Sequence, residues 1–477
     1  MTAVALASLH PFASDRRRRG TIAPTMRAPR WLLVLALSTG CGFEIGASAI
    51  DAGPGGDHDA GSDAPPDVYV EPPPRLIPGG GVADAPVLGA VHVHVVDALT
   101  RQPIEGASVD VGGIAGTTDA TGLFTARDPG LLGRQTVLAT RAGYRPTMWV
   151  GAAGANVTIS LAPTAPVVPS ASIAGTIQGF EMPPPPPGHY YGGYVLYSQS
   201  DLAFGAENQL PTAGNTHRCN IPSCTFVVTT RTGNVALLAG VYDINTNNTG
   251  TPNDDVATLA TYAYRTGLVV ENGVSQAGVV LRKLAPGELT TLSVAFGTPP
   301  AGLGEAFAYL GVELPTDGVA YLHAIPTLAE PTGLAPKLSV FPEATYRLVA
   351  VASTGQEGGA TSTVIRRGNA STSLDAGAWL PPPTGVQASR TEIRYAAVSG
   401  AVFHTVELRQ GATSLLTILV LDDTTTIAIP ASLALPGGAL TGTVGALRGT
   451  LDVTSFGMDA DGATLDATAT APVVTIN

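Results

Sequence analysis

Short apolar segments bounded by glycine or proline recur along almost the whole chain after residue 87. Val, Leu, Ala and Thr dominate them, and residue types alternate in segments such as Val91–Val95 and Asn156–Leu161. Alternation with a period of two is typical of a strand with one buried face. The 57 glycines and 39 prolines supply turns that end such strands early. Because 477 residues exceed what one small core holds, we predict an all-β protein of tandem β-sandwich domains.

The first 41 residues have the organisation of an export signal. Basic residues up to Arg30 precede a short apolar run, Trp31–Leu37, and small residues then lead to Cys41. This run is too short to span the roughly 30 Å of bilayer hydrocarbon, so it is not a transmembrane anchor. The segment resembles the bacterial lipoprotein signal, although Ser38 stands where that family usually has leucine. The resemblance implies lipidation of Cys41; ordinary secretion is the alternative.

Residues 42–86 have the composition of an acidic Gly/Pro linker, as in Asp51–Asp63 and Glu71–Pro74. Such a segment has too little apolar surface to offset its ordering entropy, so we expect a disordered, extended tether. In lipoproteins of the resembled kind, a residue other than aspartate after the cysteine, here Gly42, implies the outer membrane. The net charge of −12 offers no basic patch for phosphates, which argues against nucleic acid as a partner.

Residues 87–164 contain a series of turn motifs between alternating strands. The first motif contains Pro103-Ile104 and Gly106-Ala107, and the second contains Thr118-Asp119, Gly122 and Phe124. Gly143-Tyr144 follows, and the strand Asn156–Leu161 closes the series. This series resembles the carboxypeptidase regulatory-like domain, a seven-stranded transthyretin-like sandwich. The resemblance implies an accessory module that is often tied to adhesion or glycan binding and carries no catalytic residue.

Three further sandwiches are expected after residue 164. Segments 165–285 and 286–379 each run from an opening strand through a proline-rich loop to a strand dense in Val, Leu, Ala and Tyr, which suggests a diverged duplication. Residues 380–477 begin with Pro381-Pro-Pro and continue with short strands at regular spacing. Their spacing resembles a fibronectin type III sandwich.

Cys219 and Cys224 are the only cysteines after the signal. An exported chain enters an oxidising compartment, where two such residues are expected to pair. We therefore predict a Cys219–Cys224 disulfide that closes one hairpin tip. A redox or metal role is the alternative, and it would need further ligands or a Cys-x-x-Cys spacing.

Oxygen-bearing side chains at alternate positions follow the strand that ends near Tyr242. Asp243, Asn245 and Asn247, with Asp254 at the twelfth place, have the spacing of a calcium-binding loop. The glycine expected at the sixth place is absent, and asparagine also favours turns without any ion. Calcium is thus one candidate cofactor, and an ordinary turn is the alternative.

An aromatic cluster stands out in a chain with few aromatic residues. The run Pro183–Pro187 is followed by Tyr190, Tyr191, Tyr194 and Tyr197. A stiff polyproline loop that presents Tyr190 and Tyr191 could stack on a sugar or dock a partner protein. The alternative is that the tyrosines fill the core.

The case for catalysis is poor. His92 and His94 share one strand face without a third ligand nearby, and outward-facing histidines are the simpler interpretation. The spacing of His404 and Glu407 matches a His-x-x-Glu zinc motif but lies within a strand, so coincidence is preferred. The catalytic elbows, phosphate loops and His-Glu-x-x-His motif are missing from the sequence.

These features together predict a non-enzymatic cell-envelope lipoprotein at the outer membrane or cell surface. It would act as a spacer and as a binding or adhesion module, with the membrane as a partner through its lipid and a glycan or another surface protein as a ligand. An outer-membrane glycan-capture protein of an uptake system is the alternative function, and an enzyme whose site is assembled from scattered residues is a third.

Overall fold

The computed structural model describes residues 70–476 except 79, 165–168, 179–183, 200–216, 221–223, 248–255, 323–325 and 450–464. Within this part the chain is all β, as predicted, and its helical elements are two 3-10 turns, Pro286–Glu288 and Leu338–Val340. No helix among these residues has the length and apolar character needed to cross a bilayer. Cys41 and the rest of the expected signal lie outside the described residues.

The first sandwich packs a four-stranded sheet of order β1-β8-β2-β5 against the strands β7-β6-β3-β4. Its strands are β1 Gly81–Ala83, β2 Leu88–Asp97, β3 Ser108–Val111, β4 Ile114–Thr117, β5 Leu123–Leu132, β6 Gln135–Thr140, β7 Thr147–Ala152 and β8 Asn156–Leu161. This gives eight strands where the resemblance implied seven. The additional strand, β1, comes from residues expected to belong to the linker.

The linker boundary predicted at residue 86 is therefore wrong. Residues 70–78 and 80–86 pack on the first sandwich: β1 pairs with β8, and Ile77 and Val82 are buried. Polar side chains of the sheet satisfy the backbone of this segment, because Asn156 accepts a hydrogen bond from Arg75 N–H at 2.8 Å and Thr158 accepts one from Ile77 N–H at 2.9 Å. Composition alone did not show that the sheet offers these partners.

The turn motifs of the first sandwich have structural roles. The Thr118 hydroxyl donates to Ile104 O at 2.6 Å and accepts from Ala107 N–H at 2.9 Å, so it fastens two loops together. Gly122 has a φ of +74°, and a Cβ there would lie 2.7 Å from a β2 carbonyl oxygen, so this turn requires glycine. The Tyr144 hydroxyl donates to Asp97 at 2.9 Å. These residues shape the fold and leave no group directed at a ligand.

The second sandwich is one strongly curved seven-stranded sheet of order β11-β10-β13-β14-β15-β9-β12. Its strands are β9 Ser170–Gln178, β10 His189–Tyr197, β11 His217–Asn220, β12 Thr225–Arg231, β13 Gly233–Asn245, β14 Val256–Val270 and β15 Gln276–Lys283. One face encloses a core of its own that includes Ile173, Phe226 and Leu281. Part of the other face packs on the third sandwich through Leu238 and Tyr262.

The third sandwich packs the small sheet β19-β16-β22 on β18-β17-β20-β21. Its strands are β16 Leu289–Ala295, β17 Glu305–Leu314, β18 Gly318–Tyr321, β19 Thr332–Pro336, β20 Thr345–Ser353, β21 Thr361–Gly368 and β22 Ser373–Asp375. Both faces of β20 are buried: Leu348 and Ala350 face the small sheet, whereas Val349 and Val351 belong to the core around the first sandwich.

The fourth sandwich packs the sheet β23-β24-β27 on β29-β28-β25-β26. Its strands are β23 Thr384–Ala388, β24 Glu392–Ala396, β25 Phe403–Gln410, β26 Thr413–Val420, β27 Thr426–Ala428, β28 Leu440–Gly449, β29 Leu465–Thr470 and β30 Val474–Ile476. The last strand, β30, pairs antiparallel with β28.

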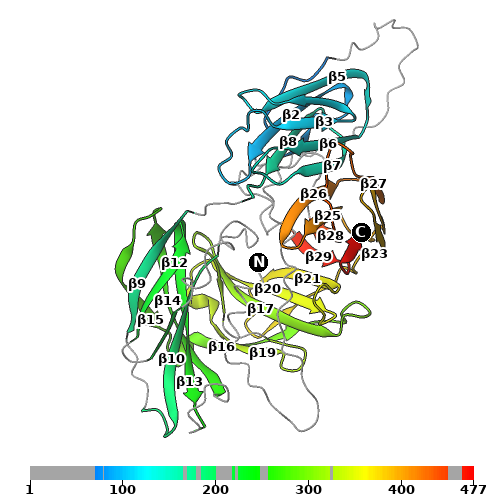
Figure 1. Ribbon diagram of the computed structural model, residues 1–477. Helices are drawn as coiled ribbons and strands as arrows, with labels where there is room; N and C mark the ends of the chain where they lie inside the picture. The colour runs from blue at the N-terminus through cyan, green and yellow to red at the C-terminus, as the bar shows by residue number, and fades with distance from the viewer. Residues whose placement is uncertain are drawn as a thin grey trace, which may run out of the picture.

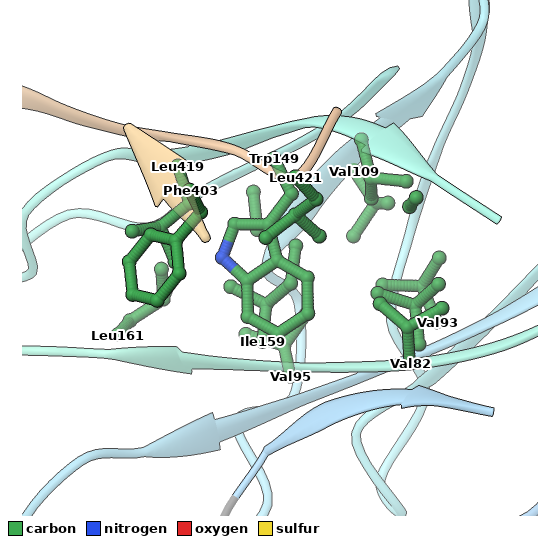
Figure 2. Close-up of a cluster of buried hydrophobic side chains, with 14 of the residues drawn as sticks. Val82, Val93, Val95, Val109, Trp149, Ile159, Leu161, Phe403, Leu419 and Leu421 are labelled. Atoms are coloured by element: carbon green, nitrogen blue, oxygen red, sulfur yellow. The ribbon is translucent and has the colours of Figure 1, made fainter. Parts of the chain in front are cut away.

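The first, third and fourth sandwiches share one continuous sheet. Strand β26 pairs in parallel with β7, and β21 pairs antiparallel with β29, so sheets from distant parts of the chain join edge to edge (Figure 1). Trp149 of β7 packs in one core with Leu161 of β8 and with Phe403 and Leu419 from the fourth sandwich (Figure 2). The first, third and fourth sandwiches are therefore not independently packed domains, because they share both backbone hydrogen-bond ladders and a hydrophobic core.

Candidate functional site

Two groups of residues singled out from the sequence meet at one end of the second sandwich. Strands β10 and β13 pair so that His189 lies opposite Asn245, Tyr190 opposite Ile244 and Tyr191 opposite Asp243. Tyr190 and Tyr191 and the first residues of the predicted calcium loop, Asp243 and Asn245, thus lie on adjacent strands, although more than fifty residues separate the two pairs in the sequence. We treat this end of the β10–β13 pair as the candidate site.

A histidine and a carboxylate form the polar centre of this site. His189 Nδ1 lies 2.8 Å from Asp243 Oδ1, and the two side chains are 24% and 31% exposed. The loops at this end are also tied together, since the Thr246 hydroxyl donates to Gly188 O at 2.8 Å. A carboxylate at Nδ1 fixes the orientation of an imidazole and leaves Nε2 as the ring nitrogen that faces elsewhere. The arrangement can therefore present one directed hydrogen-bonding group to a polar ligand.

The prediction that Tyr190 and Tyr191 together bind a ligand is wrong for Tyr191. Tyr191 is 8% exposed and lies on the sheet face that carries the core residues Val195 and Tyr197, whereas Tyr190 is 36% exposed on the opposite face. Neighbouring residues of a strand point to opposite faces, so the two rings cannot stack on one sugar. Tyr194 and Tyr197 are buried as well, in agreement with the alternative that most of the cluster fills the core.

The predicted calcium ligands have partners within the protein or lie beyond the described residues. Asp243 pairs with His189, and Asn245 Oδ1 accepts a hydrogen bond from Asn247 N–H at 2.9 Å. Asn247 has a φ of +50°, which is typical of asparagine in a tight turn. Asp254 lies outside the described residues. Among the residues that the structure describes, no three His, Cys, Asp or Glu side chains form a group that could hold a metal ion.

Cys224 is disulfide-bonded and only 1% exposed, within the core of the second sandwich. The backbone of Cys219 lies in β11, which pairs with β10 at the register Cys219 opposite Gly193. The side chain of Cys219 lies outside the described part, so the Cys219–Cys224 pairing stays a prediction. The buried disulfide gives no sign of a redox or metal role for Cys224.

His92 and His94 are buried, which corrects the interpretation that they face outward. Their exposed fractions are 0% and 9%, and Glu71 and Pro72 contact the His92 ring. His92 Nε2 lies 3.0 Å from Pro72 O and 3.2 Å from Glu71, and its Nδ1 lies 3.0 Å from the Thr125 hydroxyl. Burial lowers the pKa of His92 despite these contacts. His92 thus helps to attach the incoming chain.

His404 and Glu407 do not form a metal site. Residues three apart on a strand lie on opposite faces, and both side chains are buried in β25. His404 Nε2 accepts a hydrogen bond from Val398 N–H at 3.2 Å, and burial lowers the pKa of His404. Burial raises the pKa of Glu407, whose carboxylate lies 3.5 Å from the Arg409 guanidinium. The His-x-x-Glu spacing is thus a coincidence of sequence, as preferred.

Fold and site together define an all-β protein of joined sandwiches with one polar sheet end as its candidate site. No protein-family profile matches the chain, and no curated protein matches it. Solved structures similar to it include the Bacillus anthracis TIE protein, at 10% identity and a TM-score of 0.14, over 60% of this chain and 49% of that protein. The chain thus spans about half the length of that protein.

Two pilins also show similarity. One is the shaft pilin SpaA of Lactobacillus rhamnosus GG, at 11% identity and a TM-score of 0.13, over 42% of this chain and 99% of the pilin. The other is the minor pilin GBS52 of Streptococcus agalactiae, at 10% identity and a TM-score of 0.15, over 41% and 97%. At such TM-scores the similarities carry no conclusion about function.

Proposed function

We propose that the protein is a non-enzymatic surface protein of a bacterial envelope, anchored through a lipid on Cys41 and binding a ligand at the candidate site. The amino-terminal sequence supports export and lipidation, and the motifs of residues 87–164 support an accessory module similar to the carboxypeptidase regulatory-like domain. In this role the joined sandwiches form a rigid body that holds the site away from the membrane.

The ligand we propose is a glycan or another surface protein, bound where β10 and β13 end. The observation that carries this proposal is the register that brings His189 and Asp243 together on one face of the strand end, while the partly exposed Tyr190 lies on the other face. The directed polar pair suits the hydroxyl groups of a sugar or the polar groups of a protein partner. The buried side chains of His92, Asp97 and Glu407 lie elsewhere and are engaged by hydrogen bonds or an ion pair within the fold, which supports binding without catalysis.

An array of glycans and matrix proteins tests the binding role. We expect the full chain to bind a subset of the array and His189→Ala to weaken that binding at least tenfold. Tyr190→Ala weakens binding only if the ligand lies over the opposite face of β10. Val269→Ala is the matched control, because Val269 is 61% exposed in the same sandwich but lies toward the other end of β14. Equal binding by all three variants would place the ligand elsewhere, and turnover on a broad hydrolase panel would contradict the non-enzymatic role.

The alternative function is a glycan-capture protein that serves an uptake system, favoured by the exposed ring of Tyr190. Titration with soluble oligosaccharides distinguishes the two roles. A capture protein should bind free oligosaccharides as tightly as immobilised ones, whereas an adhesive module should depend on dense, immobilised ligand because weak sites gain strength from multivalency.

The anchor has its own test. We expect mass spectrometry of the protein from its native host to find a diacylated amino-terminal Cys41, and Cys41→Ala to release the chain from the membrane fraction. A chain that stays membrane-bound after Cys41→Ala would exclude the lipid as its anchor. An unmodified mature amino terminus would support ordinary secretion instead.

A further inference from the structure

The second and third sandwiches share one topological feature that their sequences do not suggest: the first strand and the last strand are neighbours and run parallel. The first sandwich also has a parallel pair, although β1, which precedes β2 along the chain, pairs antiparallel with β8. Strand β2 pairs with β8 over six residue pairs, from His92 opposite Asn156 to Asp97 opposite Leu161. Strand β9 pairs with β15, and β16 pairs with β22, in the same parallel sense.

This arrangement decides how a pulling force acts on each sandwich. The chain enters at the amino end of the first strand and leaves at the carboxyl end of the last strand. In a parallel pair these two points lie at opposite ends of the ladder, so pulling on them slides one strand along the other. The ladder hydrogen bonds run across the strands, and such a force loads all of them at once. A hairpin pulled at its open end instead breaks its bonds one after another.

One face of the β9–β15 ladder is buried, although the other face of β15 is largely exposed. In the second sandwich Ile173 and Ile177 of β9 and Leu281 of β15 are fully buried. Gly175 lets the two strands approach closely, since a Cβ there would collide with the Val279 carbonyl oxygen and lie 2.6 Å from the Phe226 ring. Water therefore cannot approach the ladder from the buried face to replace its bonds while they are strained.

We infer that the second and third sandwiches are mechanically resistant units in which the parallel pair of first and last strands opposes end-to-end force. The mechanical property itself requires no particular ligand, so it stands or fails separately from the binding role.

Single-molecule pulling on the full chain tests this inference in the second sandwich, whose ladders stay within its own sheet. Handles attached at Pro169 and Ala285 pull β9 and β15 in the end-to-end direction. Handles at Asn234 and Val269, which are cross-strand partners near the open end of the β13–β14 hairpin, unzip the same sandwich. We expect the end-to-end unfolding force to exceed the unzipping force by about twofold or more. Equal forces in the two directions would overturn the inference.

A pair of glycine variants locates the resistance. Gly175→Ala should lower the end-to-end force and leave the unzipping force unchanged, because the added methyl group separates β9 from β15. Gly287→Ala is the matched control, since nothing lies within 4 Å of a Cβ at that position, and both forces should stay at their wild-type values. If Gly175→Ala lowers both forces equally, the resistance is general to the sandwich. If Gly175→Ala fails to fold, the comparison of the two pulling directions in the wild-type chain still decides.

Discussion

Replacing Phe403 by alanine should destabilise the first sandwich, although Phe403 belongs to the fourth. Phe403 is 2% exposed and packs in the core that contains Trp149 and Leu161 of the first sandwich (Figure 2). The same two sandwiches are joined by the parallel ladder between β7 and β26. Removing the ring leaves a cavity that both sandwiches line.

The size of the effect follows from burial. A fully buried Phe→Ala change costs about 3–5 kcal/mol, as the sum of lost transfer free energy and the cavity. Every 1.4 kcal/mol is about a factor of ten in an equilibrium, so the lower bound corresponds to about a hundredfold loss of protection from local opening. We expect this loss for the amides of β25, and at least about a tenfold loss for the amides of β2 and β8, which share the core.

Hydrogen exchange followed by mass spectrometry measures the effect for each strand. Phe226→Ala is the matched control, because Phe226 is 1% exposed in the separate core of the second sandwich. It should reduce protection in β9 and β12 and leave β2 and β8 unchanged. Unchanged exchange of β2 and β8 in Phe403→Ala, or an equal loss in both variants, would show that the first and fourth sandwiches are not coupled through this core.

Three other changes test smaller parts of the structure. Burial acts to raise the pKa of Asp97, but hydrogen bonds from nearby N–H groups and from Tyr144 outweigh it and lower the pKa. The free energy of unfolding should therefore fall as the pH drops through this lowered pKa. Tyr144→Phe removes one of these hydrogen bonds, so it should cost about 1 kcal/mol and weaken the pH dependence. Urea titrations at several pH values measure both effects. Gly122→Ala should lower the melting temperature by several degrees, because the φ of +74° and a carbonyl oxygen 2.7 Å from the added Cβ both oppose alanine. An unchanged melting temperature would show that this turn and β2 are not in such close contact. Glu71→Gln removes the charge that pairs with Arg127 at 2.8 Å and should speed protease cleavage within residues 70–77 while the melting temperature stays constant.

The fold class could be predicted from the sequence because the period of a strand is a local property. The predicted closing strand Asn156–Leu161 coincides with β8, and the expected strand Val91–Val95 lies within β2. The joining of β7 to β26 could not be predicted, since pairing between strands more than 250 residues apart leaves no periodic trace in either one. The packing of residues 70–78 and 80–86 could not be predicted either, because their partners lie on strands far away in the sequence.

The candidate site could be predicted only in part from the sequence. Alternation along β10 could have shown that Tyr190 and Tyr191 face opposite sides of the sheet, whereas the choice of buried face depends on the surrounding strands. The pairing of His189 with Asp243 depends on the β10–β13 register, which no local signal fixes. Burial of His92 likewise depends on residues 70–77, which composition assigned to a linker.

The low charge of the chain gives a physical reason for the joined sheets. An exposed sheet edge invites pairing with other chains, and proteins commonly protect such edges with charged residues, lysine above all. Here only 13% of residues are charged, and Lys283 and Lys337 are the only lysines. Pairing β7 with β26 and β21 with β29 removes four edges without any charge. The strands whose edges could otherwise pair with other chains are thus already paired with each other.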